Sequence, residues 1–181
     1  MNELKAVIES LVFMSEGPLS MKKLKEIFDG VTENEIARAL SELVDEYEKR
    51  QGGLCLMEVA GGYQFRTAEV STPWVLKLRG GRPAALSQAA LETLAVVAYQ
   101  QPVLKSEIEQ VRGVDVSGTL KGLLDKNLVR IVGRKDVAGR PIMYGTTRRF
   151  LEVFNLRDLS ELPTLREMKE LEEYEEPETL E

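Results

Sequence analysis

The chain has 181 residues, 43% of them hydrophobic, and a formal net charge of −6, so it can form one or two compact domains with a buried core. It contains no histidine and one cysteine, Cys55, which excludes histidine-based metal sites, histidine-assisted nucleophiles and an intrachain disulfide. No apolar run approaches the roughly 20 residues that span a bilayer, and the N-terminus lacks the pattern of a signal peptide. We therefore expect a cytoplasmic protein that is not an enzyme, binds no cofactor and does not enter a membrane.

The charge is distributed unevenly along the chain. Residues 1–80 carry a net charge of −3, residues 81–157 a net charge of +5, and residues 158–181 a net charge of −8. Any attraction to nucleic acid would be local to the middle segment and opposed by both of its neighbours.

The first part of the chain predicts three helices. Apolar residues recur at helical spacing over residues 2–15. Ser20 is a candidate N-cap for a helix that ends near Phe28. Thr32 and Glu35 have the spacing of a capping box, which opens a long third helix.

A hairpin and a break follow the helices. The hydrophobic period changes to two in Leu54–Val59 and in Tyr63–Thr67, on either side of Gly61-Gly62, which we expect to form the turn. Residues 73–78 predict a short connecting helix, and the segment Gly80-Gly81-Arg82-Pro83 ends it.

The second part repeats this order. Glu9-Ser10-Leu11-Val12 matches Glu92-Thr93-Leu94-Ala95, and Pro18-Leu19 matches Pro102-Val103. The repeat predicts a first helix capped by Ser87, with Leu91, Leu94, Ala95 and Ala98 inward, and a short second helix with Ile108 and Val111 inward. A third helix is opened by Asp115. Two strands follow at 128–132 and 141–144, with Pro141 on an edge, and a closing helix covers Phe150–Leu156.

Helix, turn, helix and hairpin is the layout of a winged helix. The sequence therefore predicts a mainly α fold with small β wings (α+β), built as two tandem winged helix-turn-helix domains. We expect an N-terminal domain at 1–70, a connecting segment at 71–86, a C-terminal domain at 87–164, and an acidic tail at 165–181 that is partly helical and frayed.

DNA binding is one use of such a fold. Lys121 and Lys126 fall on the third helix of the second domain, and Arg134, Lys135 and Arg140 cluster at its wing tip, where they could contact phosphates or simply be solvated. The equivalent helix of the first domain carries several acidic residues from Glu33 to Glu48, which phosphates would repel. A DNA-binding regulator or nucleoid protein remains the alternative interpretation.

Protein docking is the other use. The apolar surplus of the first domain could build a two-fold dimer contact through Phe13, Phe28, Met57 and Tyr63, although these side chains could equally be buried within one chain. Cys55 has apolar neighbours and is interpreted as a packing residue.

Linked motifs in the second domain resemble the bacterial segregation and condensation protein B family. They are Ala98-Tyr99-Gln100-Gln101-Pro102, Val111-Arg112-Gly113-Val114, Gly133-Arg134-Lys135, Gly139-Arg140-Pro141 and Tyr144-Gly145-Thr146-Thr147. The chain departs from the family at Leu104, where Thr or Ser is usual, and so loses a helix cap worth about 1 kcal/mol.

The resemblance implies a non-enzymatic subunit of the condensin-like SMC–kleisin complex, which acts in chromosome condensation and partition during cell division. It implies a homodimer joined through the N-terminal domain that binds the kleisin ScpA and, through it, the SMC ATPase, so that contact with chromosomal DNA is indirect. Within this hypothesis we place Arg112, Arg140, Pro141 and Tyr144 near the partner surface; alternatively, Pro141 only shapes the wing and Arg112 ties a helix end.

Overall fold

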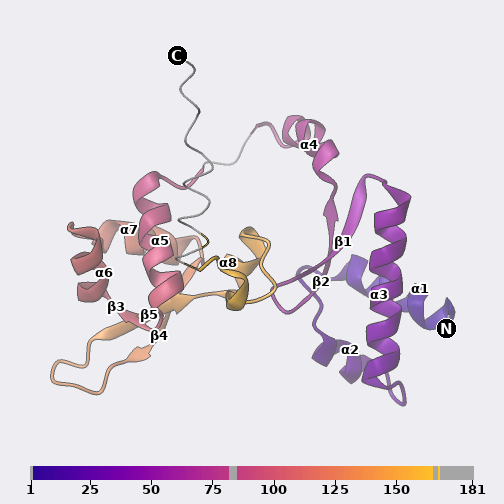
Figure 1. The fold of residues 1–181 in the computed structure, drawn as a ribbon, viewed down its shortest axis with the longest axis horizontal. Helices are drawn as coiled ribbons and strands as arrows, with labels where there is room; N and C mark the ends of the chain where they lie inside the picture. Colours follow the sequence, from indigo (N-terminus) through magenta and orange to yellow (C-terminus); the bar gives the residue numbers. More distant parts are fainter. Residues whose placement is uncertain (1, 82–84, 165–166, 168–181) are drawn as a thin grey trace.

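The computed structural model describes residues 2–81, 85–164 and 167, which form two helix-and-hairpin units in succession (Figure 1). The first unit contains α1 (Asn2–Met14), α2 (Met21–Ile27), α3 (Glu33–Arg50), β1 (Leu54–Val59) and β2 (Gly62–Thr67), and is followed by the 3-10 turn η1 (Glu69–Ser71) and by α4 (Thr72–Leu78). The second contains α5 (Gln88–Gln100), β3 (Val103–Leu104), α6 (Lys105–Arg112), α7 (Ser117–Asp125), β4 (Val129–Arg134), β5 (Ile142–Thr146), α8 (Arg148–Val153) and η2 (Leu159–Glu161). The predicted α+β winged-helix fold is confirmed.

The helix starts follow the predicted capping chemistry. The Ser20 hydroxyl accepts a hydrogen bond from the Lys23 amide, and the Ser87 hydroxyl accepts one from the Ala90 amide, each at 3.3 Å. At the start of α3, Thr32 Oγ1 accepts from the Glu35 amide at 3.3 Å, while Glu35 Oε2 accepts from the Thr32 amide at 2.8 Å. These bonds satisfy amide groups that a helix leaves unpaired at its first turn.

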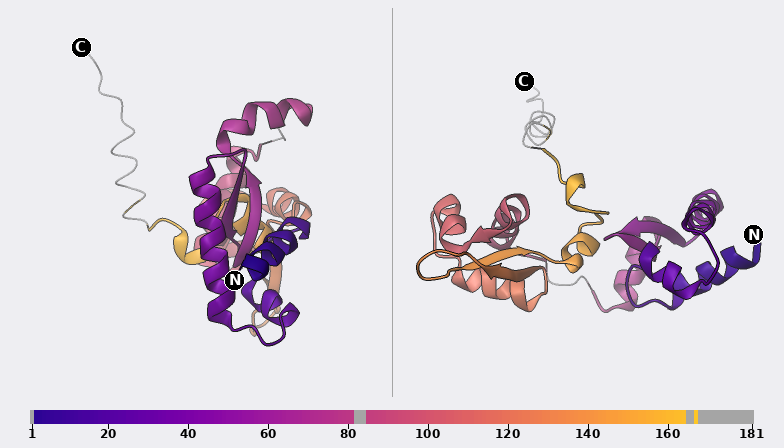
Figure 2. Two further views of the ribbon diagram at one scale, coloured as in Figure 1. Left: turned by 90° about the vertical axis from the view of Figure 1, so that its right-hand side faces the viewer. Right: turned by 90° about the horizontal axis from the view of Figure 1, so that it is seen from below.

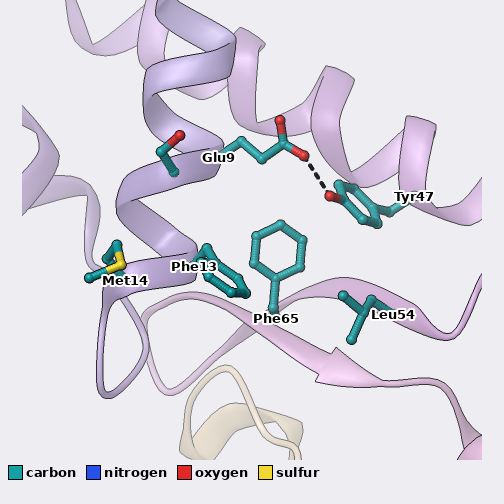
Figure 3. Close-up of a pocket in the computed structure, with 7 residues that line it drawn as sticks. Glu9, Phe13, Met14, Tyr47, Leu54 and Phe65 are labelled. Atoms are coloured by element: carbon teal, nitrogen blue, oxygen red, sulfur yellow. Dashed lines mark hydrogen bonds between the residues drawn. The ribbon is translucent and has the colours of Figure 1, made fainter.

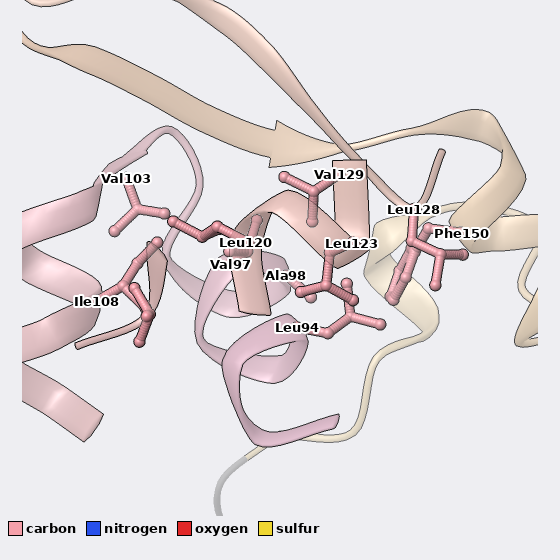
Figure 4. Close-up of a cluster of buried hydrophobic side chains, with 11 residues drawn as sticks. Leu94, Val97, Ala98, Val103, Ile108, Leu120, Leu123, Leu128, Val129 and Phe150 are labelled. Atoms are coloured by element: carbon pink, nitrogen blue, oxygen red, sulfur yellow. The ribbon is translucent and has the colours of Figure 1, made fainter. Parts of the chain in front are cut away.

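Each unit has its own buried cluster. In the first unit it joins α1, α2, α3 and β1, and includes Ile8, Leu24, Ile36, Leu40 and Leu43. In the second unit the side chains converge from α5, α6, α7, β4 and α8 (Figure 4); they are Leu94, Val97, Ala98, Val103, Ile108, Val116, Leu120, Leu123, Leu128, Val129 and Phe150. Two separate cores agree with the repeat in the sequence.

The turn of the first hairpin lies one residue earlier than the expected Gly61-Gly62. Val59 pairs with Gly62, so the loop residues are Ala60 and Gly61, with φ of +50° and +67°. Gly62 is instead needed in β2, because a Cβ there would lie 2.8 Å from the backbone carbonyl of Leu19. The close approach of Leu19 to β2 therefore explains why glycine is needed at position 62.

The returning strand is paired on both of its sides in both units. Leu19 forms an isolated antiparallel bridge to Tyr63, and β3 pairs Val103 with Tyr144. The order of the second sheet is therefore β3-β5-β4. The expected edge position of Pro141 was wrong in this respect, because the residue precedes the central strand β5, and its carbonyl accepts the Lys135 amide at 2.9 Å.

The buried faces of α5 and α6 also differ from those that the hydrophobic periodicity predicts. In α5 the buried residues are Thr93, Leu94, Val97 and Ala98, whereas Leu91 and Ala95 are exposed. Apolar residues surround this helix, so its sequence does not single out one face; its packing against α6 and α7 does. In α6, Ile108 is buried but Val111 is exposed.

Asp115 lies one residue before the N-cap position of α7, which is occupied by Val116. Its carboxylate accepts hydrogen bonds from the Ser117 hydroxyl at 2.7 Å and, more weakly, from the Ser117 amide at 3.4 Å. Asp115 therefore supports the start of α7 without being its N-cap. Asn127 ends this helix with φ of +55°, in the C-terminal turn that the sequence predicts.

Hydrogen bonds from main-chain amides and from one arginine side chain join the two units. The amides of Ala60 and Gly61 donate to the carbonyls of Leu156 and Arg157 at 2.8 and 2.9 Å. The Arg148 guanidinium in turn donates to the carbonyls of Ala60 at 3.1 Å and Pro18 at 2.5 Å. This contact, which we call the interunit joint, places α8 between the units (Figures 1 and 2).

The Gln101 side chain holds the returning strand of the second unit against α5. Its Oε1 accepts the Thr146 amide at 2.8 Å, and its Nε2 donates to the Thr146 hydroxyl at 3.0 Å and to the Ala98 carbonyl at 3.1 Å. The Gln101–Pro102 peptide bond is cis. The side chain thus satisfies polar groups of a buried residue, Thr146.

Substituting Gln101→Ala should lower the free energy of unfolding by about 1–3 kcal/mol, because the buried amide and hydroxyl of Thr146 lose their hydrogen-bond partner. Denaturant unfolding followed by circular dichroism would measure the loss, and amide exchange at Thr146 should accelerate. The neighbouring Gln100→Ala, at an exposed position, is the matched control and should change stability by less than about 0.5 kcal/mol. Equal stability of the two variants would contradict the assigned role.

Candidate functional site

The first unit has an open apolar hollow between α1, α3 and the hairpin (Figure 3). Its volume is about 400 Å³, and its lining residues are Glu9, Ser10, Phe13, Met14, Tyr47, Leu54 and Phe65. Phe13 and Met14, at the end of α1, are 68% and 76% exposed. Large apolar side chains grouped around an open hollow are typical of a docking surface.

Aromatic contacts fix the floor of this hollow. The rings of Tyr47 and Phe65 meet edge to face with centroids 4.8 Å apart, and Phe13 meets Phe65 at 6.5 Å. The Tyr47 hydroxyl donates a hydrogen bond of 2.5 Å to Glu9 Oε1. That bond, and secondarily burial, raises the pKa of Tyr47 above its usual value.

The four residues predicted for a dimer contact do not form one surface. Phe13 lies at the hollow, whereas Phe28 and Tyr63 pack against the buried cluster of the first unit. Met57 is exposed, but strand alternation puts it on the face of the hairpin opposite Leu56, which points into the core. The pattern in the sequence did not single out Met14, Leu54 and Phe65, because these residues come together only through the packing of α1 on the hairpin.

The second unit has a hollow of about 440 Å³ between the start of α6 and the wing. Its lining residues are Leu104, Lys105, Ser106, Glu109, Arg134, Pro141, Ile142 and Tyr144. Two of the residues predicted for partner binding, Pro141 and Tyr144, therefore lie together at one hollow. Its apolar floor and charged rim could hold a segment with one apolar and one polar face.

The other two predicted partner residues lie elsewhere. Arg140 is exposed at the wing tip with φ of +39°, and its carbonyl accepts a bond from Arg134 Nη1 at 2.9 Å. Arg112 pairs with Glu92 and so connects the end of α6 to α5. Its Nε is buried without a hydrogen-bond partner among the described residues, so this side chain is placed as a connection between helices.

The cations proposed for DNA contact do not form a uniform phosphate-binding surface. Lys135 pairs with Glu107 at 3.5 Å, and Arg134 contacts the Arg140 carbonyl. On α7, which corresponds to the recognition helix of a DNA-binding winged helix, Lys121 is exposed next to Gly118 and Gly122, which offer no side chain to a base edge. The geometry favours protein docking over base reading.

The described residues contain no group of three or more His, Cys, Asp or Glu placed to hold a metal ion. Cys55 Sγ donates a weak bond of 3.5 Å to the Arg66 carbonyl within the hairpin. Within the described ranges, no helix is both long and apolar enough to cross a membrane.

Known proteins resemble this chain over nearly its whole length. Residues 6–165 match the family described as "Segregation and condensation complex subunit ScpB". The chain belongs to this family. It is 52% identical over 162 residues to segregation and condensation protein B of Syntrophotalea carbinolica, with 90% of this chain and 82% of that protein covered.

Two further proteins are similar to this chain. Segregation and condensation protein B of Myxococcus xanthus is 47% identical over 163 residues, which cover 90% of this chain and 49% of that protein. A solved structure described as "Crystal structure of dimer of ScpB N-terminal domain complexed with ScpA peptide" is 26% identical, covers 42% of this chain and 95% of that chain, and has a TM-score of 0.39. The resemblance found in the sequence motifs is confirmed at the level of the family.

Several of the motifs that carry the ScpB resemblance have structural roles here. Gln101 binds Thr146, and a Cβ on Gly145 would lie 2.8 Å from Val132 Cγ1 and 2.9 Å from Gln101 Oε1. Thr147 caps α8 by accepting the Phe150 amide at 3.1 Å. At Leu104 the side chain provides no cap, but Glu107 Oε2 still accepts the Leu104 amide at 2.8 Å, which keeps half of a capping box.

Tyr47→Phe should lower the free energy of unfolding by about 1 kcal/mol at pH 7, since it removes the bond to Glu9. Because the folded-state pKa of Tyr47 is raised, this stabilisation is fully present below the unfolded pKa of about 10 and is lost as the pH rises through the folded pKa. Denaturant titrations of both proteins between pH 7 and 11 would measure the difference.

Tyr63 also titrates, but it is present in both proteins, so its contribution cancels in the comparison. The variant Glu9→Gln, which keeps an acceptor oxygen for Tyr47, should lose less stability than Tyr47→Phe. A difference between wild type and Tyr47→Phe that does not change with pH would contradict the assigned hydrogen bond.

Proposed function

We propose that this chain is a non-enzymatic subunit of a bacterial SMC–kleisin complex, acting in chromosome condensation and partition during cell division. It forms a homodimer in the cytoplasm, associated with the nucleoid, and binds the kleisin ScpA and, through it, the SMC ATPase. Its contact with chromosomal DNA is indirect. The observation that carries the proposal is the match to the ScpB family over residues 6–165.

The two units have different roles in this proposal. Residues 1–70 form the dimerising domain, residues 71–86 connect the domains, and residues 87–164 form the partner-binding domain. The apolar hollow of the first unit, with Phe13 and Met14 at its edge, supports a role in association. The related crystal structure of an ScpB N-terminal-domain dimer with a ScpA peptide is consistent with both partners.

The hollow beside the wing supports kleisin binding by the second unit. Leu104, Ile142 and Tyr144 give it an apolar floor, and Lys105 and Arg134 lie at its rim with Glu109. An amphipathic helix that places apolar anchors on this floor would keep its polar face in water. The rim offers charges of both signs, so it also selects the direction in which the segment lies.

The mass of the full chain in solution tests the proposal. We expect twice 20.3 kDa for the chain alone, measured by light scattering after gel filtration, and a larger stable species after mixing with ScpA at micromolar concentration. A monomer that forms no complex with the kleisin would overturn the proposal.

Ser106→Arg tests the place of kleisin binding, because Ser106 is exposed and lines the second hollow. The larger, charged side chain should obstruct the hollow and weaken kleisin binding by about tenfold or more, in the range found for central interface positions. Gln110→Arg, on the same helix but outside the hollow, should bind as wild type does. Titration calorimetry with full-length ScpA would distinguish them; equal affinities would place the site elsewhere.

A further inference from the structure

The segment after the first hairpin presents a continuous apolar stripe to solvent. Val70, in η1, and Trp74 and Leu78, in α4, are 78%, 69% and 89% exposed. Because η1 and α4 follow each other without a break, these residues at i, i+4 and i+8 lie along one side of the helical segment. We call them the α4 stripe.

A helix as short as α4 needs support from outside itself. It has seven residues, and isolated helices shorter than roughly 12–15 residues are marginal in water. Among the described elements, its one substantial contact is with η1, the turn that precedes it. Val75 and Leu76 are half-buried, whereas the three residues of the α4 stripe are largely exposed.

The same unit carries an apolar surface that could receive this stripe. The hollow of Figure 3 is lined by Phe13, Met14, Leu54 and Phe65. Leu54 begins β1 directly after Gly53, whose carbonyl accepts the Ala68 amide at 2.9 Å, just before η1. The hollow and the α4 stripe are therefore neighbours at the open end of the hairpin.

We infer that the α4 stripe of one copy docks in the Phe13 hollow of a second copy, and that the second copy returns the same contact. This inference rests on the proposed homodimer and assigns its interface. A two-fold axis requires each copy to offer both halves of such a contact, and the first unit carries an apolar projection and an apolar hollow side by side.

Charge complementarity supports a second copy as the occupant. The charged residues of α4 and its C-cap are Lys77 and Arg79, both basic, and η1 adds one acidic residue, Glu69, so the segment that carries the stripe has a small net positive charge. Glu9 of α1 lines the hollow, and the adjacent α3 carries five Glu and one Asp against three basic residues. Lys77 Nζ lies 5.0 Å from the centre of the Trp74 ring, so a cation accompanies the aromatic anchor toward an acidic surface.

The available area is also sufficient. Aromatic side chains bury roughly 150–250 Å² each, and Phe13 and Trp74 are joined by four other exposed apolar residues, Met14, Leu54, Val70 and Leu78. In a two-fold dimer each copy buries both its α4 stripe and its Phe13 hollow, and together these reach the order of the roughly 800 Å² per partner of a standard stable interface. A single contact of one stripe with one hollow would bury much less than this area.

Trp74 is the only tryptophan of the chain, so its fluorescence reports on this surface without any substitution. In the full-length wild-type dimer we expect a blue-shifted emission and protection from acrylamide quenching. In the variants Phe13→Glu and Leu78→Glu, Trp74 should become accessible and the dimer dissociation constant should rise about 30-fold or more, as for central interface anchors. Ile131→Glu, at an exposed apolar position of the second unit, is the control and should change neither the Trp74 fluorescence nor the dimer dissociation constant.

Mixing two weakened variants tests the reciprocal contact itself. Phe13→Glu and Trp74→Lys should each dimerise poorly alone. Together they should form a heterodimer, because one contact pairs Glu with Lys and the other keeps the native Phe13 and Trp74. Light scattering and native mass spectrometry would measure all three samples.

The outcomes separate this inference from the proposed function. A wild-type dimer with freely quenched Trp74, or variants that remain dimeric, would overturn the assigned interface while the proposed dimer stands. Trp74 protection that requires added ScpA would likewise overturn it and assign the stripe to the kleisin. A monomeric wild-type chain would overturn both. Restored dimerisation in the mixture alone would support the reciprocal contact.

Discussion

Pairing of the returning strand on both sides is the constraint on which both units depend. A two-stranded hairpin alone is at best marginally stable in water, and here each hairpin is tied to its helices by a segment that follows the first helix. Leu19 pairs with Tyr63 in the first unit, and Val103 pairs with Tyr144 in the second. The close approach of Pro18 and Leu19 leaves no room for a Cβ at Gly62, and the side chains of Val132 and Gln101 leave none at Gly145. In the second unit the Gln101 side chain adds hydrogen bonds to the same place.

The interunit joint fixes the turn of the first hairpin against α8 and the segment that follows it. It uses the amides of Ala60 and Gly61, which the tight turn leaves pointing outward, and the carbonyls of Leu156 and Arg157 as acceptors. Arg148 adds charged donors to two carbonyls of the first unit. Because all four of these acceptors are main-chain oxygens, the joint depends on the shape of the turn more than on side-chain identity. The Phe13 hollow and the hollow beside the wing lie in different units of the molecule.

These features make the two units suited to docking. The acidic α3 of the first unit and the small residues on the exposed side of α7 leave neither helix equipped to read DNA bases. Their exposed apolar surface lies at the end of α1, along η1 and α4, and on the floor of the wing hollow. Membership of the ScpB family agrees with this chemistry, since the family consists of subunits of a larger assembly.

The sequence by itself determined the features that depend on local interactions. The caps at Ser20, Thr32 and Ser87 and the period of each helix are set by neighbours a few residues apart, and so could be predicted. The repeat and the linked motifs further determined the winged-helix fold and the family. For the candidate site, the sequence predicted Phe13 at a dimer contact and Pro141 and Tyr144 near a partner surface, and these three line hollows. It left open whether Phe28, Tyr63 and Arg112 serve contacts or structure, and in the structure they pack or pair within the chain.

Only the tertiary structure decided which surfaces these residues build. The Phe13 hollow takes its lining from α1, α3 and both strands of the hairpin, so no local pattern could bring Met14, Leu54 and Phe65 together. The inward faces of α5 and α6, the one-residue shift of the first turn, and the central place of β5 all follow from contacts between segments far apart in the chain. Local sequence encodes helices, caps and turns because their partners are nearby, whereas a face becomes buried or available only when distant elements have packed.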